Sequence, residues 1–200
     1  MSGLKTSVYC PYCHRHTSLQ VAPAEYGSSY DPKYTAAAWK ATEFRTWWIG
    51  ICNNCHGALL VLNGGEEVIP PPLPSPTDSR IPEPMRQDLI EAKECFSIDA
   101  YRACAVMARR SMQAACIDKG AVKDKLVEQL AELLNSGKIT NDLKEWADVV
   151  RWVGNDAAHP NKEKVTSVEA EDILKLAEQF LHVLYVAPAI AKERKDAMGK

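Results

Sequence analysis

The chain has 200 residues, which fits one ordinary domain or a small module joined to a larger one. Apolar residues make up 46% and charged residues 25%, a balance that excludes a wholly disordered chain. The net charge of −2 excludes a protein that binds polyanions through bulk positive charge, so any nucleic-acid contact must come from a local site. The longest purely apolar runs, such as 58–62, are much shorter than the roughly 20 residues of a membrane span. With no secretion signal at the N-terminus, we expect a cytoplasmic protein.

The first module is marked by its cysteines. The chain has seven, and an odd number without an export signal argues against a disulfide scaffold. Four of them form two C-x-x-C turns, Cys10-Pro11-Tyr12-Cys13 and Cys52-Asn53-Asn54-Cys55. Two thiolates on each of two tight turns complete a tetrahedral Zn–S site with no open position. We therefore predict a structural zinc ion bound by four thiolates, those of Cys10, Cys13, Cys52 and Cys55.

Other interpretations of these cysteines remain open at this stage. They could be free thiols, or two of them could form a redox pair. Redox chemistry needs only one C-x-x-C pair, so the presence of two matched pairs favours a metal site. The neighbouring His14, His16 and His56 could replace a cysteine as ligand, or lie exposed, or hydrogen-bond around the site. The residues between the two turns exceed the usual ribbon spacing, which predicts a long excursion from Tyr26 to Trp39.

Short strands are expected around these turns. Three stretches carry β-branched, aromatic or aliphatic residues: 17–21, 44–49 and 58–62. The last of them ends at a turn signal, Asn63-Gly64-Gly65. The aromatic residues Phe44, Trp47 and Trp48 could offer a surface on which bases stack, although aromatic side chains of a small ribbon more often form its core.

The division of the chain follows from its prolines. They are dense from Pro70 to Pro84, where neither a helix interior nor a central strand can form. This stretch is typical of a semi-rigid spacer, and it could alternatively bind a proline-recognising domain. We predict a zinc-ribbon-like module over 1–69, a proline-rich linker over 70–84 and a helical bundle over 85–200, an α+β fold.

After the linker the apolar residues follow a helical period. About five helices are predicted: 84–96, 99–118, 123–135, one beginning at Thr140 or Asn141, and one beginning near Thr166. The fourth is expected to bury Leu143, Trp146 or Ala147, Val150 and Val153. Thr166 and Glu169 form a capping-box pattern, and Pro188 is expected to end or kink the last helix, leaving 189–200 as a frayed tail.

A polar stripe is expected on the fourth helix. If this helix continues to its end, Asp148, Arg151, Asn155 and His159 share one face. Arginine offers fixed donors to phosphate oxygens and histidine titrates near neutrality, so this face could bind a phosphate and move a proton. The alternative is structural: Gly154-Asn155-Asp156 could be a helix-ending turn, with His159 capping a neighbour.

Two segments carry a family resemblance. They are Ala105-Val106-Met107-Ala108-Arg109-Arg110-Ser111-Met112-Gln113 and Arg151-Trp152-Val153-Gly154-Asn155-Asp156-Ala157-Ala158-His159-Pro160. Residues 85–187 resemble a bacterial domain-of-unknown-function family related to the HEPN superfamily. Members of that family occur alone, often behind a cysteine-paired module, and fused to type I restriction subunits.

The resemblance implies a dimeric bundle of about five helices in anti-phage defence or nucleic-acid processing. Active HEPN proteins are metal-independent ribonucleases in which arginine and histidine from two subunits meet. If this site is transferred to the present sequence, Arg151 and His159 match the arginine and histidine of the family. Asn155 or Asp156 then matches the polar residue that assists them. His159 would then act as general acid or base and Arg151 would stabilise charge developing on phosphorus. Two further residues could add phosphate contacts, Arg109 and Arg110.

Three hypotheses follow for the function. The favoured one is a dimeric binding module, associated with defence or nucleic acid, that recognises RNA, DNA, a partner protein or an antitoxin. The second is a ribonuclease that uses Arg151 and His159, so enzymatic activity is left open. In the third, the chain is a structural dimer whose polar stripe is an interface network. The nearly neutral charge favours the first over an efficient nuclease.

Overall fold

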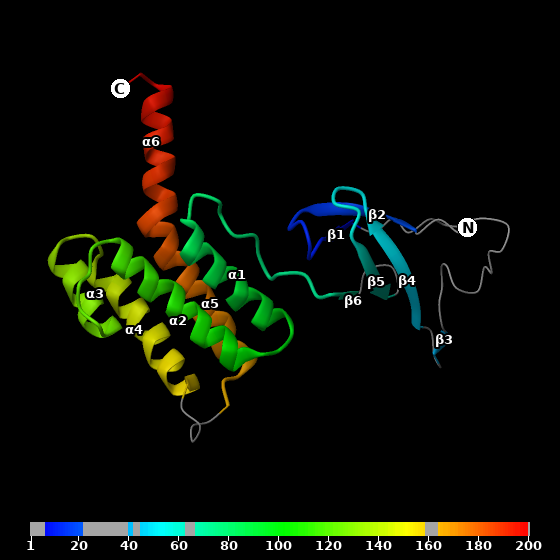
Figure 1. The fold of residues 1–200 in the computed structure, drawn as a ribbon, viewed down its shortest axis with the longest axis horizontal. Coiled ribbons are helices and arrows are strands. Elements are labelled where there is room, and N and C mark those ends of the chain that lie inside the picture. The colour runs from blue at the N-terminus through cyan, green and yellow to red at the C-terminus, as the bar shows by residue number, and fades with distance from the viewer. Residues whose placement is uncertain (1–6, 22–39, 42–44, 63–66, 159–163, 200) are drawn as a thin grey trace. The chain divides into compact units, whose positions relative to one another are not determined.

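A computed structural model of the chain describes residues 7–21, 40–41, 45–62, 67–158 and 164–199 (Figure 1). The chain divides into two compact units, Met1–Pro76 and Thr77–Lys200. The division falls inside the proline-rich segment, where residues 70–82 form neither helix nor strand. The first unit is a small antiparallel sheet and the second is entirely helical among its described residues. The fold is therefore α+β.

The first unit is one antiparallel sheet. Its strands are β1 (Ser7–Tyr9), β2 (His16–Val21), β3 (Lys40–Ala41), β4 (Arg45–Cys52), β5 (Ala58–Leu62) and β6 (Glu67–Ile69). They are ordered β1-β2-β4-β5-β6, and β3 also pairs with β4. The three predicted strands are present as β2, β4 and β5. The other strands have two or three residues each, too few to show an alternating pattern in the sequence.

The pairing of β2 with β4 brings the two C-x-x-C turns to one end of the sheet. In this antiparallel pair Leu19 lies opposite Cys52. Because β2 begins after the first turn and β4 ends at the second, both turns meet at the same end. The described core of the sheet is thin and includes two of the cysteines: Val8, Cys10, Leu19, Cys52, Leu59, Val61 and Val68. A small sheet of this kind is often stabilised by an additional crosslink.

Some of the sequence predictions for this unit fall outside the described part of the chain. They are the excursion from Tyr26 to Trp39, the turn at 63–65 and Phe44. Trp47 and Trp48 lie on β4, in register with Leu62 and Val61, and their side chains are not among those described.

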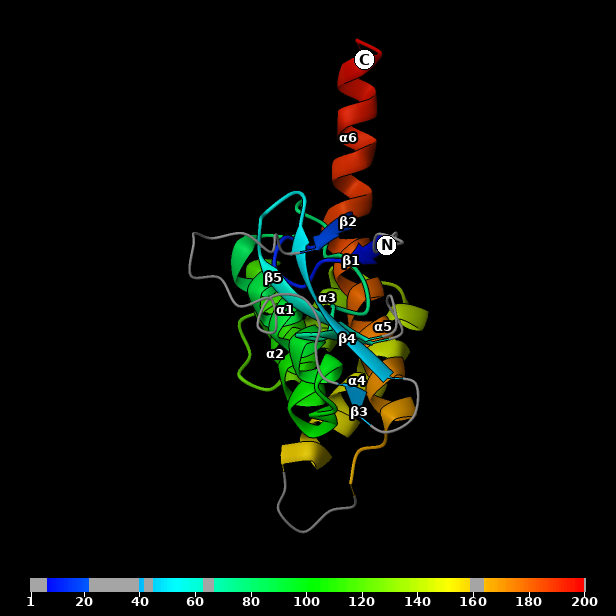
Figure 2. The same ribbon diagram turned by 90° about the vertical axis from the view of Figure 1, so that its right-hand side faces the viewer.

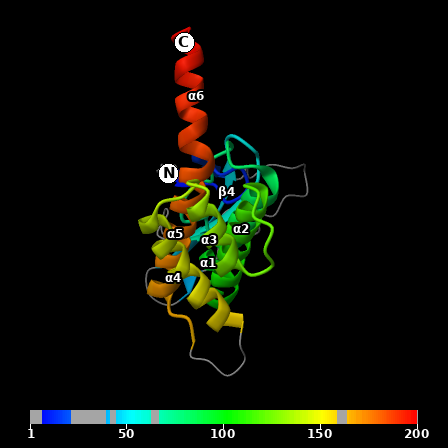
Figure 3. The same cartoon turned by 90° about the vertical axis from the view of Figure 1, so that its left-hand side faces the viewer.

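The second unit contains the predicted helices. They are α1 (Glu83–Ser97), α2 (Tyr101–Asp118), α3 (Leu126–Asn135), α4 (Asn141–Ala158), and α5 (Ser167–Leu181), which continues through a π-helical turn (His182–Val186) into α6 (Ala187–Ala197). The central helix is α2, which packs against α1, α3, α4 and α5 (Figures 1 and 3). The capping box at Thr166 is confirmed: its hydroxyl accepts from the Glu169 N–H, and its own N–H donates to the Glu169 carboxylate.

Small residues on α2 determine how the bundle packs. Ala105, Ala108 and Ala115 are fully buried, so neighbouring helices approach the α2 backbone closely. Larger side chains from the surrounding helices fill the remaining space: Leu89, Leu130, Leu133, Ile173, Phe180 and Leu181. On α4, Leu143, Ala147 and Val150 are buried as expected. Trp146 is not, since 44% of it is exposed, and Ala147 takes the buried place instead.

Of the expectations for the C-terminus, the end of the helix at Pro188 and the frayed tail over 189–200 were wrong. Pro188 neither ends the helix nor precedes a frayed tail, because α6 extends to Ala197. The physical reason lies in the π turn just before the proline, where the Ala187 N–H donates to the His182 carbonyl five residues earlier. The wider turn shifts the hydrogen bonds and lets proline occupy the first turn of the next helical segment, where its missing N–H is tolerated.

Together α5, the π turn and α6 form a continuous helix of 31 residues, Ser167–Ala197. Among the described residues it is the one helix long and apolar enough, by length and composition, to cross a membrane. Of its most apolar stretch, 44% is buried within the fold. The α6 half extends beyond the other helices (Figure 2) and buries no residue of its own.

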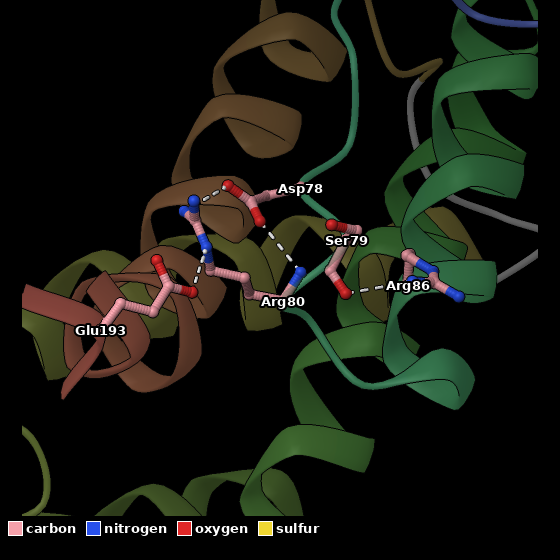
Figure 4. A network of polar contacts seen from close by, with 5 residues as sticks. All are labelled: Asp78, Ser79, Arg80, Arg86 and Glu193. Atoms are coloured by element: carbon pink, nitrogen blue, oxygen red, sulfur yellow. Dashed lines mark hydrogen bonds and ion pairs between the residues drawn. The ribbon is translucent and has the colours of Figure 1, made fainter. Parts of the chain in front are cut away.

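A polar network fastens the start of the helical unit to α6 (Figure 4). Arg80 Nε lies 3.2 Å from a Glu193 carboxylate oxygen, and Arg80 also pairs with Asp78 at 3.2 Å. Arg86 of α1 donates to the Ser79 carbonyl at 3.1 Å. The end of the linker therefore lies along the bundle between α1 and α6.

Candidate functional site

Four cysteine sulfurs gather where the two C-x-x-C turns meet. The Sγ atoms of Cys10, Cys13, Cys52 and Cys55 all lie within 4.8 Å of one another. Cys10 Sγ is 3.7 Å from Cys55 Sγ, and Cys13 Sγ is 3.9 Å from Cys52 Sγ. A disulfide would require about 2.05 Å. Four sulfurs bound to zinc at about 2.3 Å would be about 3.8 Å apart at the corners of a tetrahedron. The spacing thus fits a metal ion coordinated by four thiolates.

The two turns share one backbone conformation. In each, the residue after the second cysteine donates its N–H to the carbonyl of the first: His14 to Cys10 and His56 to Cys52, both at 2.9 Å. Both histidines have positive φ, 52° and 60°, which reverses the chain. They therefore serve as backbone turn positions, and the ligand cluster among the described residues is made of cysteines alone.

Contacts between the turns hold them together. The hydroxyl of Tyr12 from the first turn donates to the Ala58 carbonyl after the second, at 3.0 Å. Gly57 makes room for the Tyr12 ring, because a Cβ at that position would lie 2.4 Å from a ring carbon. The Asn53 side chain reaches back to the Ser18 hydroxyl on β2.

Hydrogen bonds to the Cys52 sulfur favour the thiolate, which is the form that binds a cation. The N–H groups of Asn54 and Cys55 lie 3.4 and 3.5 Å from Cys52 Sγ. Burial raises the pKa of Cys52, but these N–H groups and the Thr17 hydroxyl outweigh it and lower the pKa to about 6. Burial raises the pKa of Cys10 to about 12. The Cys52 thiol is therefore predisposed to the thiolate form that a metal binds.

A second polar cluster lies on α4. Asp148 accepts from Lys144 Nζ at 2.7 Å and from Arg151 Nε at 2.9 Å. Burial raises the pKa of Asp148, but these two cations outweigh it and hold the pKa below its usual value. The carboxylate fixes the Arg151 side chain through Nε and leaves its terminal N–H groups to contact other atoms. The guanidinium carbon also lies 5.4 Å from the centre of the Trp152 ring.

Arg109 of α2 lies beside this cluster. Its pKa is lowered, first by burial and then by the positive charge of Arg151. Its Nε is buried and has no hydrogen-bond partner among the described residues. The neighbouring Arg110 differs, because its Nε lies 3.2 Å from the Asp88 carboxylate of α1. Of the two arginines singled out on α2, the structure brings Arg109 and not Arg110 to the α4 stripe.

Gly154 makes this approach of α2 to α4 possible. A Cβ there would lie 2.8 Å from both Cβ and Cδ of Arg109, and 3.1 Å from the Ala105 carbonyl oxygen. Because a Gly→Ala change inside a helix ordinarily stabilises by about 0.5–1 kcal/mol, a clash reverses the expected sign. We expect Gly154→Ala to destabilise the helical unit by about 1–3 kcal/mol, measured by urea unfolding. An unchanged or higher stability would contradict the close packing.

The remaining predicted site residues follow along α4. The helix is continuous to Ala158, so Asn155 follows Arg151 by one turn on the same side, as expected. The helix-ending turn considered at Gly154 does not occur, since the helix continues beyond it. The side chains of Asn155 and Asp156 are not among those described, and His159 lies outside the described residues.

Sequence reasoning missed a cavity in the helical unit. It is open to solvent, has a volume of about 750 Å³ and is lined by the end of α1, the start of α2, Ala157 of α4 and the segment Lys164–Val165. No motif marks it, because its lining residues come from four separate segments of the chain. Only the packing of the helices brings them together.

These features define a two-part protein in which a sheet with a four-cysteine cluster precedes a helical bundle that brings Arg109 of α2 to the polar stripe of α4. The profile of one family, described as "Domain of unknown function (DUF4145)", matches residues 90–198, which covers most of the helical unit. The chain belongs to this family. Comparison with curated proteins and with solved structures gives no match.

Proposed function

We propose that the chain is a nucleic-acid-binding module whose helical unit binds phosphate groups through Arg109 and Arg151. The observation that carries the proposal is the position of Arg109, whose side chain packs against Gly154 of α4 and whose pKa is lowered by burial and by the charge of Arg151, one turn earlier on that helix. Two guanidinium groups at one place repel each other, and an anion between them removes that repulsion. The planar donor fork of arginine matches the geometry of phosphate oxygens.

The sheet has a supporting part in this proposal. Zinc bound by Cys10, Cys13, Cys52 and Cys55 would have four protein ligands and no open position, so its role would be structural. The four-sulfur donor set favours zinc over hard cations such as magnesium or calcium, which prefer oxygen. The zinc-ribbon-like module would then be a domain stabilised by its metal ion rather than a catalytic centre.

Replacement of Arg109 by glutamine tests the phosphate site. We expect Arg109→Gln to weaken the binding of a fluorescein-labelled RNA or DNA strand roughly tenfold, because one charged contact is worth about 1.5–3 kcal/mol before compensation. The slope of log affinity against log salt should also fall by about 1. Fluorescence anisotropy at several salt concentrations measures both quantities.

Arg110→Gln is the matched control, since it removes an equal charge one residue away at a site paired with Asp88. Its salt slope should change less than that of Arg109→Gln. Equal effects of the two substitutions would mean that only general charge matters and would contradict the proposed site. Absence of any binding by the wild-type protein would reject the function itself.

A ribonuclease remains the second candidate. It is favoured by the course of α4, which is continuous to Ala158 and carries Asn155 one turn after Arg151. In that case Arg151 would stabilise the charge on phosphorus and His159 would transfer the proton. Incubation of RNA without added divalent cations distinguishes the candidates. Wild-type cleavage that leaves 2′,3′-cyclic phosphate ends, lost in a folded His159→Ala variant, would identify the enzyme.

We also propose that the module is a homodimer in the setting of anti-phage defence, with an antitoxin or another protein as a further partner. Support for an interface comes from α4, where three large apolar side chains are substantially exposed: Trp146, Val149 and Trp152. Apolar surface of this kind is often covered by a partner. The molar mass from light scattering on the purified protein tests the dimer.

A further inference from the structure

The cavity of the helical unit has apolar walls and a charged rim. Its walls are formed by side chains of α1, α2, α4 and the segment before α5: Cys95, Val106, Met107, Ala157 and Val165. The lining also includes two acidic residues, Glu91 and Asp99, and two basic residues, Arg102 and Lys164, which together are called the charged rim. Pockets that bind small planar groups combine apolar walls with a few polar groups in this way.

The cavity continues the proposed phosphate site along the seam between α2 and α4. Val106 lies one helical turn before Arg109, and Ala157 lies one turn after Gly154. Arg102 and Arg109 are seven residues apart on one face of α2, which places them about 10 Å apart along the axis. A phosphate chain can therefore extend from the arginine pair to the rim of the cavity.

The rim of the cavity is held in a defined conformation. Asp99 has a positive φ of 61°, an uncommon conformation for a residue other than glycine. Its N–H donates to the Phe96 carbonyl at 3.1 Å, and its carboxylate accepts from the Tyr101 hydroxyl at 2.5 Å. This bond holds the Tyr101 hydroxyl, and the ring of Tyr101 belongs to the cavity lining, where an aromatic face can stack on a base.

We infer that this cavity takes an unpaired nucleobase from a single strand whose phosphates contact Arg109 and Arg151. The inference rests on the proposed function and adds the class of nucleic acid. The apolar walls of the cavity accept the flat faces of a base. Glu91 at the rim can accept a hydrogen bond from an exocyclic amino group of the base. A duplex keeps its bases stacked and paired, so single strands are favoured.

Ala103→Leu tests the cavity with little risk to the fold. Ala103 lines the cavity and is exposed, and leucine is a good helix former that narrows the space without offering an aromatic face. The control is Ala191→Leu at an exposed position of α6. Affinities are measured for a single-stranded 12-mer and for an abasic 12-mer with the same phosphates. The wild type and the control should prefer the strand with bases at least fivefold, and Ala103→Leu should lose this preference.

Alkylation of Cys95 gives an independent measurement of occupancy. Cys95 lies in the cavity wall and is partly exposed, whereas the other two cysteines of the helical unit, Cys104 and Cys116, are buried. The strand with bases should slow modification of Cys95 by N-ethylmaleimide several-fold, and the abasic strand should not. Mass spectrometry of the peptide that contains Cys95 follows the rate.

The outcomes separate the two levels of the proposal. Equal affinity of the wild type for both strands, or a base preference kept by Ala103→Leu together with unprotected Cys95, would overturn the cavity inference and leave the phosphate site intact. No binding of either strand would overturn the proposed function and the inference with it.

Discussion

A chain with Cys52 replaced by serine is expected to lose its bound metal and the fold of its antiparallel sheet, while the helical unit stays folded. Serine preserves the shape of the side chain but supplies no thiolate, so a four-sulfur site becomes incomplete. Structural zinc contributes about 10–16 kcal/mol in small zinc-binding peptides, which exceeds what a thin apolar core provides. The helical unit has its own core and does not depend on this site.

Two measurements on the full-length protein check this result. Elemental analysis should give one metal ion per wild-type chain and much less than one for Cys52→Ser. Calorimetry should show two transitions for the wild type, of which the variant keeps only that of the helical unit. Cys95→Ser is the matched control, because this cysteine lies in the helical unit and should leave the metal content unchanged. A folded, metal-free sheet in Cys52→Ser would refute the structural role.

The cysteine cluster could be predicted from sequence because its geometry is local. Two cysteines three residues apart lie on one turn whatever the surrounding fold, and only the meeting of the two turns needed the β2–β4 pairing. The capping box of α5 was equally predictable, since Thr166 and Glu169 contact each other within one helical turn. Predictions of this kind depend on neighbours along the chain.

The features that escaped prediction depend on contacts between distant segments. Periodicity placed Trp146 and Ala147 on the same buried side of α4, and only the packing decides that alanine faces the core. Two arginines were visible on α2, but the difference between Arg109 and Arg110 arises from the positions of Gly154 and Asp88 on other helices. At Pro188 the sequence shows a helix breaker, whereas the preceding π turn accommodates it.

A buried lysine unites three parts of the helical unit. Lys93 of α1 is completely buried. Its ammonium pairs with the Glu178 carboxylate of α5 and donates to the Thr77 hydroxyl at 2.8 Å. Burial lowers the pKa of Lys93, and Glu178 opposes that effect. The Glu178 side chain is 27% exposed, whereas the Lys93 side chain is fully buried, so water still reaches the carboxylate but not the ammonium.

This difference predicts unequal effects of the two single substitutions. Glu178→Gln leaves the buried Lys93 ammonium without its carboxylate and should destabilise the helical unit by about 3–5 kcal/mol. Lys93→Met replaces the charge with an apolar side chain of similar length and leaves a carboxylate that water reaches, so about 1 kcal/mol or less is expected. Urea unfolding followed by far-UV circular dichroism measures both, and equal losses would mean that the pair acts only as packing.

The pH dependence of Glu178→Gln provides a further check. Without the carboxylate, burial lowers the pKa of Lys93 still further below its ordinary value of 10.5. Between the folded and unfolded pKa values the unfolded chain binds the additional proton, so the stability of the folded state rises with pH. The deficit of Glu178→Gln relative to the wild type should therefore shrink as pH is raised from 7 toward 10. A constant deficit over that range would show that Lys93 stays charged and that the loss has another origin.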